Sequence, residues 1–446
     1  MLKTLARGIL ALEPFLIVAS VFWFWMIDPN RIFGLLMFIP PMIARLILYR
    51  RLWKPTPLDP FFVIFLALCV ISVYTAPYTR GNITLGGELF QASVPYNNIL
   101  PFRPLMGMLL VISMADAAWR RQNLNVLIWI SIALGLLIGI LGMSASQWTT
   151  KSTLFLPFLD LLPRITQFPG ANGGFNVNEI GGAMAWLTPL MATIAIMAWR
   201  NADPTRWGWI QRISATTAFI LLISALFFGQ SRFALIGVIL ALAIIIYFLM
   251  PKGNPRRWAY IALAIFTIVE LLIFAKILDT ESTASSLAQR DEDSVTSRLL
   301  IWGSGLAMIE DYPLTGVGMN MFRDNPLREA YPVEGYLVGE RILPHAHNEL
   351  IQVGADLGLP GLFVFIAWHA VLLWMFFKVL RSQRENWIAL AWVVGVITAL
   401  LSHAVFGMGD AITLWDRFTF LFWWVMGLGA ATYVVYQHPT PSPKTQ

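Results

Sequence analysis

Apolar positions along the chain are grouped in runs of about 20 residues that recur from one end to the other. A helix rises 1.5 Å per residue, so about 20 residues cross the roughly 30 Å hydrocarbon core of a bilayer. The pattern predicts twelve transmembrane helices, over residues 9–27, 32–49, 60–75, 99–117, 124–142, 178–199, 213–229, 232–250, 258–278, 358–380, 387–406 and 417–436. The expected fold class is therefore an all-α polytopic membrane protein, organised as a single transmembrane domain over residues 1–446.

Lys and Arg in the connecting segments set the expected orientation, because cytoplasmic loops carry an excess of them. The segments assigned to the cytoplasm hold basic groups such as Arg50/Arg51/Lys54, Arg120/Arg121 and Lys252/Arg256/Arg257. This assignment puts both termini in the cytoplasm. It leaves three long segments on the outer face, at about 76–98, 143–177 and 279–357. Long loops are more often functional than short ones, because a short connection suffices for topology.

Composition agrees with a membrane protein and narrows the function classes. Hydrophobic residues make up 57% and charged residues 13% of the 446 residues, and no single soluble core could bury so much apolar surface. The formal net charge of +6 arises from short juxtamembrane loops, where lipid headgroups and topology explain it, so nucleic-acid binding is excluded. Cys69 is the only cysteine, so no intrachain disulfide can form.

The outer segment 279–357, between spans 9 and 10, has a helical pattern of its own. Asp293 or Ser294 can cap a helix that runs to about Ile309 and stops at Tyr312-Pro313. Residues 315–320 then predict a glycine-containing loop whose backbone can approach a ligand closely. A second short helix is expected after Pro344, ending near Asp356 before Gly358 and Pro360, with His347 in its first turn.

Four arginines stand out because the positive-inside rule makes outer arginines unexpected: Arg232, Arg298, Arg323 and Arg341. Arg232 is the most informative, since it begins an apolar span, where an unpaired charge is costly to desolvate. A planar guanidinium suits bidentate binding of phosphate oxygens. The alternative is a snorkelling side chain at the membrane interface.

His347 is the best candidate for chemistry. Both the positive end of a helix and nearby arginines disfavour protonation, and a neutral imidazole can act as a general base. His347 could instead only cap the loop, and His345, two residues away, could be the base. A zinc site at His345-x-His347 is a weak hypothesis, because the sequence shows no third ligand nearby.

Other ionisable side chains fall within the predicted spans. Glu13, Arg103 and Glu270 are intramembrane candidates, and an Arg103–carboxylate pair could be structural or part of a transport path. His369 and His403 are expected to pack in the bundle or face lipid.

The motifs in residues 168–380 resemble the O-antigen ligase and Wzy-type polysaccharide polymerase superfamily. The matching blocks are, in order, Phe175-Asn176-Val177-Asn178, Gln230-Ser231-Arg232, Ser297-Arg298 with Ile301-Trp302, 311–318 (DYPLTGVG), and His347-Asn348-Glu349-Leu350 with 358–361 (GLPG). The last two blocks, at this spacing after an apolar helix that opens with Ser-Arg, carry most of the resemblance.

The resemblance implies an inverting, metal-independent glycosyltransferase without a cofactor, located in the bacterial inner membrane with its active site on the periplasmic face. The donor would be a glycan on undecaprenyl pyrophosphate. His347 corresponds to the family's base, and Arg232, Arg298 and Arg323 correspond to arginines around the pyrophosphate. His345, Asn348, Arg341 and Asn178 are possible supporting residues.

Two activities within the family remain open. A single His-Asn motif and one dominant outer segment resemble those of ligases, and they favour an O-antigen ligase, with lipid A-core as the acceptor, over a Wzy-type polymerase that joins lipid-linked repeat units of O-antigen, capsule or exopolysaccharide. A transporter or flippase for lipid-linked glycans would also suit twelve spans, but it predicts paired halves with a mid-membrane site, and none is visible. A peptidoglycan glycosyltransferase of the shape, elongation and division type would rely on a carboxylate instead of a histidine. The sequence sets neither the sugar nor the oligomeric state.

Overall fold

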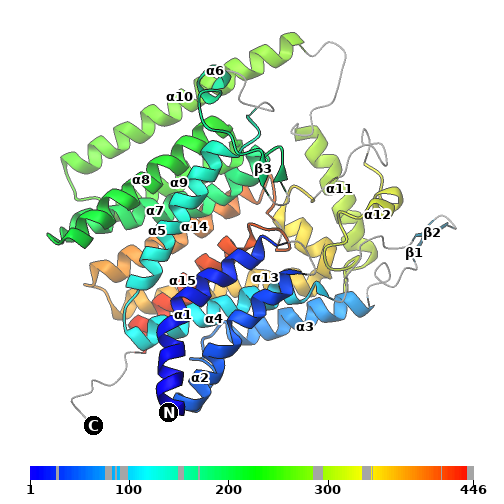
Figure 1. Ribbon diagram of the computed structural model, residues 1–446. Coiled ribbons are helices and arrows are strands. Elements are labelled where there is room, and N and C mark those ends of the chain that lie inside the picture. Colours follow the sequence, from blue (N-terminus) through cyan, green and yellow to red (C-terminus); the bar gives the residue numbers. More distant parts are fainter. Residues whose placement is uncertain are drawn as a thin grey trace.

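The structure is a computed structural model, and it describes residues 1–26, 30–75, 83–85, 88–90, 99–148, 155–168, 171–284, 295–333, 343, 345–412 and 414–438. Figure 1 shows a bundle of long, tilted helices with shorter elements gathered at one end. The helices are α1 Leu2–Phe24, the 3-10 helix η1 Asn30–Met37, α2 Ile39–Tyr49, α3 Asp59–Thr75, α4 Phe102–Arg121, α5 Asn125–Ser144, α6 Leu156–Leu159, α7 Val177–Asn201, α8 Arg206–Gly229, α9 Arg232–Leu249, α10 Asn254–Ala284, α11 Val295–Asp311, α12 Asn325–Ala330, α13 Glu349–Ser382, α14 Trp387–Phe406 and α15 Thr419–Gln437.

The predicted helical membrane architecture is confirmed. In the described part of the chain, ten helical segments are long and apolar enough to cross a membrane by length and composition. One of the ten joins η1 and α2 over Asn30–Tyr49. Of the two other predicted spans, α3 is an apolar helix of 17 residues and α10 is a helix of 31 residues. Each of the twelve apolar runs therefore contains a helix.

In the part of the chain that the structure describes, strands occur in two short antiparallel ribbons. β1 (Ile83–Leu85) pairs with β2 (Glu88–Phe90), and β3 (Gln167–Phe168) pairs with β4 (Ala171–Asn172). Both ribbons belong to the long segments that the sequence assigns to the outer face. They add no sheet to the core of the bundle.

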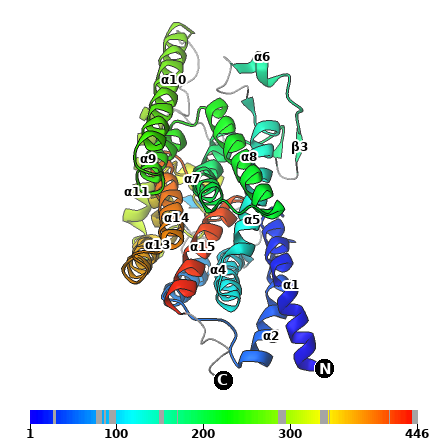
Figure 2. The same ribbon diagram turned by 90° about the vertical axis from the view of Figure 1, so that its left-hand side faces the viewer.

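The helix α7 lies at the centre of the bundle, where it packs against α5, α8, α9 and α14 (Figure 2). In its most apolar 18-residue window, 94% of the residues are buried inside the protein. A second group of contacts joins α4 to α15 and α13 to α3, α11 and α15. Large buried side chains, including Trp186, Trp368 and Trp423, fill the space between these helices.

The helix α13 consists of two segments that meet at Gly358. The backbone there is non-helical, with φ of 70° and ψ of −175°, which strongly favours glycine. Leu359 N donates to Pro313 O (2.7 Å), and Val317 N donates to Ala355 O (2.8 Å). The predicted end of a short helix near Gly358 is thus confirmed as a break, beyond which the helix continues.

The glycine loop at 315–320 has a different role from the expected one. A Cβ atom on Gly316, whose φ is +64°, would lie 2.5 Å from Ala355 O and Asp356 C. Glycine at this position therefore lets the loop approach the backbone of α13 closely. This contact holds the loop against the break at Gly358.

Candidate functional site

His347 lies just before α13 and not in its first turn, which corrects the sequence-based expectation. Asn348 is the N-cap residue, and its side chain accepts hydrogen bonds from Leu350 N (3.0 Å) and Ile351 N (3.2 Å). His347 itself has a φ of +49°, in the left-handed region. His347 therefore stands in the turn before the helix, and Asn348 caps the helix directly after it.

Two histidines converge on one carboxylate in this turn. His347 Nδ1 lies 3.3 Å from Asp410 Oδ1, and His345 Nε2 lies 3.5 Å from the same oxygen. The two imidazole rings meet edge to face with their centroids 4.3 Å apart. Only 11% of the His347 side chain and 5% of the Asp410 side chain is exposed. We call these three residues the His–Asp site.

The hydrogen bonds indicate where the imidazole protons lie. The backbone N–H of His347 donates to His345 Nδ1 (3.2 Å), so a neutral His345 carries its proton on Nε2, toward Asp410. Burial, reinforced by the nearby His347, lowers the pKa of His345 to about 4, so this ring is neutral at pH 7. Burial alone would raise the pKa of Asp410, but contacts with His347 and His345 lower it overall, which keeps the carboxylate ionised.

The same reasoning assigns a role to each nitrogen of His347. Its Nδ1 faces the Asp410 carboxylate, which favours a proton on that atom. Its Nε2 then has a free lone pair, and it forms no hydrogen bond with any described residue. The arrangement provides an oriented acceptor for one proton.

Among the described residues, His345, His347 and Asp410 are also a set that could hold a metal, with one ligand atom each within 4.8 Å of the others. Asp410 supplies the third ligand that the sequence did not reveal. The hydrogen bond to His345 Nδ1 argues against metal coordination, because the proton is then on Nε2, the atom that a metal at this point would need. The residues fit an acid–base pair better than a metal centre.

Two of the predicted arginines are placed beside the His–Asp site by helix contacts. Trp302 Nε1 donates to His347 O (3.2 Å), and Arg298 lies one turn earlier on α11. The Arg298 guanidinium is buried over the ring of Phe233, 5.2 Å from its centroid. Phe233 follows Arg232, the first residue of α9, and fills the space that a side chain on Gly409 would need. The start of α9 therefore adjoins the loop that carries Asp410.

Arg323 is held by the same loop from another direction. Its Nη2 lies 2.8 Å from Asp416 Oδ1. Burial opposes its charge, but the nearby carboxylate of Asp416 raises the pKa of Arg323 overall, so the guanidinium stays protonated. Arg323 thus shares its charge with an acidic neighbour that the sequence analysis did not identify.

Asp356 anchors both loops from within α13. Its carboxylate accepts from Phe322 N (3.1 Å), Trp415 Nε1 (2.8 Å) and Gln352 Nε2 (2.8 Å), and it is fully buried. Gln352 Oε1 in turn accepts from Ala346 N (2.8 Å). One hydrogen-bond chain therefore positions the residues next to Arg323, Asp416 and His347.

The remaining predicted site residues have separate outcomes. Asn178 lies half-buried in the first turn of α7, and its backbone N–H donates to the N-cap side chain of Asn176 (2.8 Å). Its neighbour Glu179 lies 3.3 Å from Arg417 Nε, which ties α7 to the loop after α14. Arg341 lies outside the described residues.

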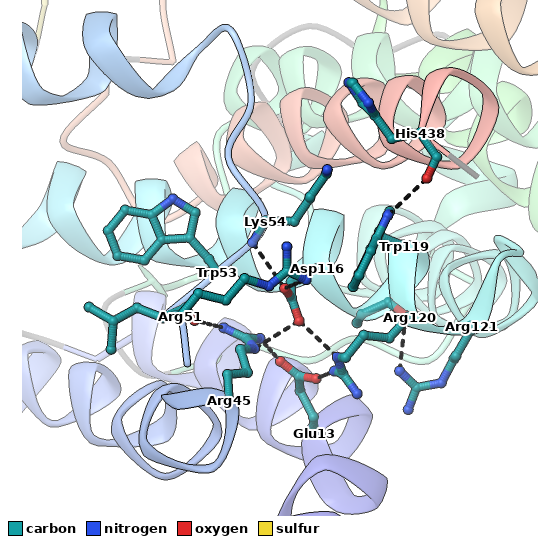
Figure 3. A network of polar contacts seen from close by, with 12 residues as sticks. Glu13, Arg45, Arg51, Trp53, Lys54, Asp116, Trp119, Arg120, Arg121 and His438 are labelled. Atoms are coloured by element: carbon teal, nitrogen blue, oxygen red, sulfur yellow. Dashed lines mark hydrogen bonds and ion pairs between the residues drawn. The ribbon is translucent and has the colours of Figure 1, made fainter. Parts of the chain in front are cut away.

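The ionisable residues that the sequence places within membrane spans lie in different parts of the structure. Glu13 pairs with Arg45 and Arg120, and Asp116 joins them in a buried cluster (Figure 3). Arg103 Nη1 donates to Trp415 O (2.9 Å), a backbone carbonyl of the segment between α14 and α15. Glu270 on α10 accepts from Gln230 Nε2 (3.1 Å), which precedes Ser231-Arg232.

Sequence reasoning missed Asp410, Asp416 and Arg417, which all lie between α14 and α15. The segment is short, and residues opposite one another in the site are 63 positions apart in the chain, as for His347 and Asp410. The available signal was the concentration of three charged residues within a predicted outer connection of 407–416 and its border. Histidine and aspartate in separate outer loops do not reveal their pairing without the helix packing.

The fold and the site together define a helical membrane protein with a buried acid–base pair beside several arginines. Residues 217–366 match the sequence model of the family described as O-Antigen ligase, and the matched region includes Arg232, Arg298, Arg323 and His347. The resemblance to the O-antigen ligase and Wzy-type superfamily is therefore confirmed over this region.

One curated relative adds a second comparison. The chain is 24% identical over 206 residues to the "Teichuronic acid biosynthesis protein TuaE" of Bacillus subtilis (strain 168). The match covers 44% of this chain and 40% of the relative, so it spans less than half of either protein. Both comparisons concern proteins named for bacterial polysaccharides.

Proposed function

We propose that this protein is an inverting, metal-independent glycosyltransferase that moves a glycan from undecaprenyl pyrophosphate to an acceptor hydroxyl on the periplasmic face of the bacterial inner membrane. The observation that carries the proposal is the 3.3 Å contact between His347 Nδ1 and Asp410 Oδ1, which leaves Nε2 open. The family match supports a ligase or polymerase, and the apolar helices support a membrane-embedded substrate.

In the proposed reaction, His347 Nε2 accepts the proton of the acceptor hydroxyl as its oxygen attacks the anomeric carbon. A new carbon–oxygen bond forms, and the bond from the anomeric carbon to the pyrophosphate oxygen breaks on the opposite face. Undecaprenyl pyrophosphate leaves with the bonding electrons, and the configuration inverts. Ionised Asp410 stabilises the imidazolium that forms, which is the reason for its short distance to Nδ1.

Arginines would stabilise the negative charge that develops on the leaving pyrophosphate. Arg298 and Arg232 adjoin the His–Asp site through Phe233 and Trp302, and we assign them to the pyrophosphate. Arg323 is assigned to the same group, although its pairing with Asp416 reduces the charge that it offers. Asp416 would then set how strongly Arg323 holds the donor.

Two acceptors are distinguished by different observations. The family description favours an O-antigen ligase with lipid A-core as its acceptor. The relative named for teichuronic acid biosynthesis favours a second candidate, a polymerase that joins lipid-linked repeat units. The site chemistry is the same in both cases, because each uses a hydroxyl nucleophile and a pyrophosphate leaving group.

The test is donor turnover in liposomes. The donor is the lipid-linked glycan extracted from source cells that lack this protein, and the acceptor is either lipid A-core or more of the lipid-linked glycan. We expect release of undecaprenyl pyrophosphate that requires one acceptor, survives a chelator, and is lost in Arg232→Ala and Arg298→Ala. Loss of turnover with the chelator, restored by a divalent metal, would instead establish His345, His347 and Asp410 as a metal site.

Arg164→Gln is the matched control. Arg164 belongs to another predicted outer segment and pairs with Asp160 of the same segment, and both side chains are exposed. Its loss should leave turnover unchanged. An intact protein that only moved the lipid-linked glycan across the bilayer, without releasing undecaprenyl pyrophosphate, would refute the proposal and favour a transporter.

A further inference from the structure

Two buried side chains behind the site, His403 and Glu349, form a contact that the proposed chemistry does not use. His403 lies in the last turn of α14, and Glu349 is the first residue of α13. His403 Nδ1 lies 3.4 Å from Glu349 Oε2, and the two side chains are 2% and 10% exposed. An imidazole at a helix C-terminus and a carboxylate at a helix N-terminus each suit the local helix dipole.

Backbone hydrogen bonds through Gly407 join the same two residues. Gly407 N donates to His403 O (2.7 Å), and Glu349 N donates to Gly407 O (2.8 Å). A Cβ atom on Gly407 would lie only 2.8 Å from Glu349 Oε2. Side chains and backbone therefore connect the ends of α13 and α14 in a closed circuit, which we call the helix-end clamp (His403, Glu349 and Gly407).

A stacked indole fixes His403 from the opposite side. The Trp186 ring of α7 lies 3.8 Å from the His403 ring, centroid to centroid, at an interplanar angle of 15°. Trp186 is 2% exposed and belongs to the central helix of the bundle. The clamp is thus packed against a deeply buried helix, and close packing on both faces leaves its imidazole little freedom to rotate.

The clamp lies close to both partners of the His–Asp site in the chain. His347 is two residues before Glu349, and Asp410 is three residues after Gly407. A shift of one helix end relative to the other would change the 3.3 Å separation between His347 Nδ1 and Asp410 Oδ1. Proton-transfer geometry is sensitive to such a change, because misplacement by about 1 Å can cost roughly 10²-fold in rate.

We propose that His403 and Glu349 are positioning residues, which hold His347 and Asp410 at the separation needed for base catalysis without touching the substrate. The inference rests on the proposed function, because it assumes that His347 is the base. It assigns an indirect catalytic role to a histidine within a membrane span.

The experiment compares variants that keep the contact with variants that remove it. His403→Asn retains an N–H near the position of Nδ1, and Glu349→Gln retains a carbonyl acceptor, whereas His403→Leu and Glu349→Leu lose these groups. In the liposome assay with extracted lipid-linked glycan, we expect kcat to fall about tenfold to 10²-fold in the Leu variants, with an unchanged KM for the donor. The Asn and Gln variants should retain kcat within about threefold, since they preserve a polar contact between the two side chains.

A double variant and a control separate positioning from general damage. His403→Leu combined with Glu349→Leu should be no slower than either single variant, because both remove the same contact. Thr398→Val is the control, since Thr398 is another buried polar residue of α14 and its hydroxyl donates, among the described residues, to carbonyls of its own helix, Val394 O (2.7 Å) and Gly395 O (3.1 Å). It should turn over normally.

Gly407→Ala covers the case in which a Leu variant does not fold. Its methyl group would press on Glu349 Oε2 without removing any polar group, and kcat should fall with KM unchanged. Normal kcat in folded His403→Leu or in Gly407→Ala, or additive losses in the double variant, would overturn the positioning role. A failure of the intact protein to release undecaprenyl pyrophosphate would refute the proposed function itself, which is a distinguishable result.

Discussion

The arginine cluster of Glu13, Arg45, Asp116 and Arg120 and the His–Asp site are both buried groups of charges, but they differ in how completely they are paired. In the cluster, Glu13 uses one carboxylate oxygen for Arg45 and the other for Arg120. Asp116 Oδ2 lies 2.9 Å from Arg45 Nε and 2.8 Å from Arg120 Nε. Together these contacts join α1, α2 and α4, and the one between Asp116 and Arg120 lies within α4 (Figure 3).

The second oxygen of Asp116 is also occupied. Asp116 Oδ1 accepts from Lys54 N (3.0 Å) and lies 3.6 Å from Arg51 Nη2. No carboxylate oxygen in the cluster is left for a ligand. The cluster therefore resembles a fully paired, structural ion-pair network, since buried charges are tolerated where paired groups offset their desolvation.

The His–Asp site instead keeps one hydrogen-bond acceptor unused. His347 Nε2 has no hydrogen-bond partner among the described residues, while its Nδ1 and its backbone N–H and C=O all have close neighbours. A histidine that is held at its backbone and at Nδ1, with Nε2 open, has the arrangement expected of a general base. An atom without a hydrogen-bond partner, and not burial alone, distinguishes a candidate site from a structural ion-pair network.

The largest expected effect is on catalysis at the open site. Replacement of His347 by Ala should lower kcat about 10³-fold, because general bases contribute about 10² to 10⁴-fold. The thermal unfolding temperature in detergent should change little, since the lost side chain makes few contacts with the described residues, chiefly the 3.3 Å contact to Asp410 and the edge-to-face contact with the His345 ring. Initial rates and unfolding curves on the same preparation are the measurements. A stable variant with normal kcat would show that the base is elsewhere, with His345 the next candidate.

The saturated cluster should respond in the opposite way. Replacement of Glu13 by Ala leaves Arg45 and Arg120 without that partner, and the free energy of unfolding should fall by about 3 kcal/mol. Turnover per folded molecule should stay normal, because no carboxylate oxygen in the cluster is left for a ligand. Chemical unfolding in detergent with parallel turnover assays tests this. Glu385→Ala, at the connection between α13 and α14 and in the exposed part of the chain, is the control. A loss of turnover without a loss of stability would mean that the cluster takes part in function.

The helices were predictable because the length of each apolar run indicates by itself a helix in the membrane. Twelve runs of apolar residues have a helix in the structure, and Gly358 and Pro360 correctly marked the break in α13. The exact start of α13 was predicted wrongly, because it depends on which side chain caps the helix. His347 was expected in the first helical turn, whereas the Asn348 side chain caps the helix one residue later.

The site was only half predictable for a similar reason. His347, Arg232 and Arg298 could be selected because a charge or an imidazole at a membrane boundary is unusual on its own. Asp410 is an ordinary loop aspartate until α13 and α14 bring it to His347. Asp356 is hidden further, because its importance lies in hydrogen bonds from Phe322 and Trp415, which belong to two other segments of the chain. Pairwise geometry of this kind is a property of packing and not of any local pattern.

Asp410 provides the next test of the comparison. Its replacement by Asn removes the negative charge that orients the Nδ1 proton of His347 and stabilises the imidazolium. We expect kcat to fall about 10²-fold with little change in the KM for the donor. Asp311→Asn is the matched control, since Asp311 accepts from the Tyr331 hydroxyl (2.7 Å) at the end of α11. Equal rates in the two variants would remove Asp410 from the mechanism.

The smallest effect concerns His345, which links stability to pH. Its pKa in the folded protein is lowered to about 4, mainly by burial, from 6.5 in an open environment. Between these values the unfolded chain binds more protons than the folded protein, so stability decreases as the pH falls through this window. From about pH 7.5 to about pH 5.5, this one group should cost roughly 1 kcal/mol of unfolding free energy.

Replacement of His345 by Gln should flatten the pH dependence, because Gln has no titratable group. Gln also offers a carbonyl oxygen in place of the Nδ1 atom that accepts from His347 N, so turnover at about pH 7.5 should fall by no more than about threefold. Chemical unfolding in detergent at both pH values measures the effect. If the intact protein and the variant lost the same stability on acidification, the buried neutral imidazole would not be its source. If the variant instead lost all turnover with normal stability, His345 would act in the chemistry, and the division between one base and one supporting ring would have to be reversed.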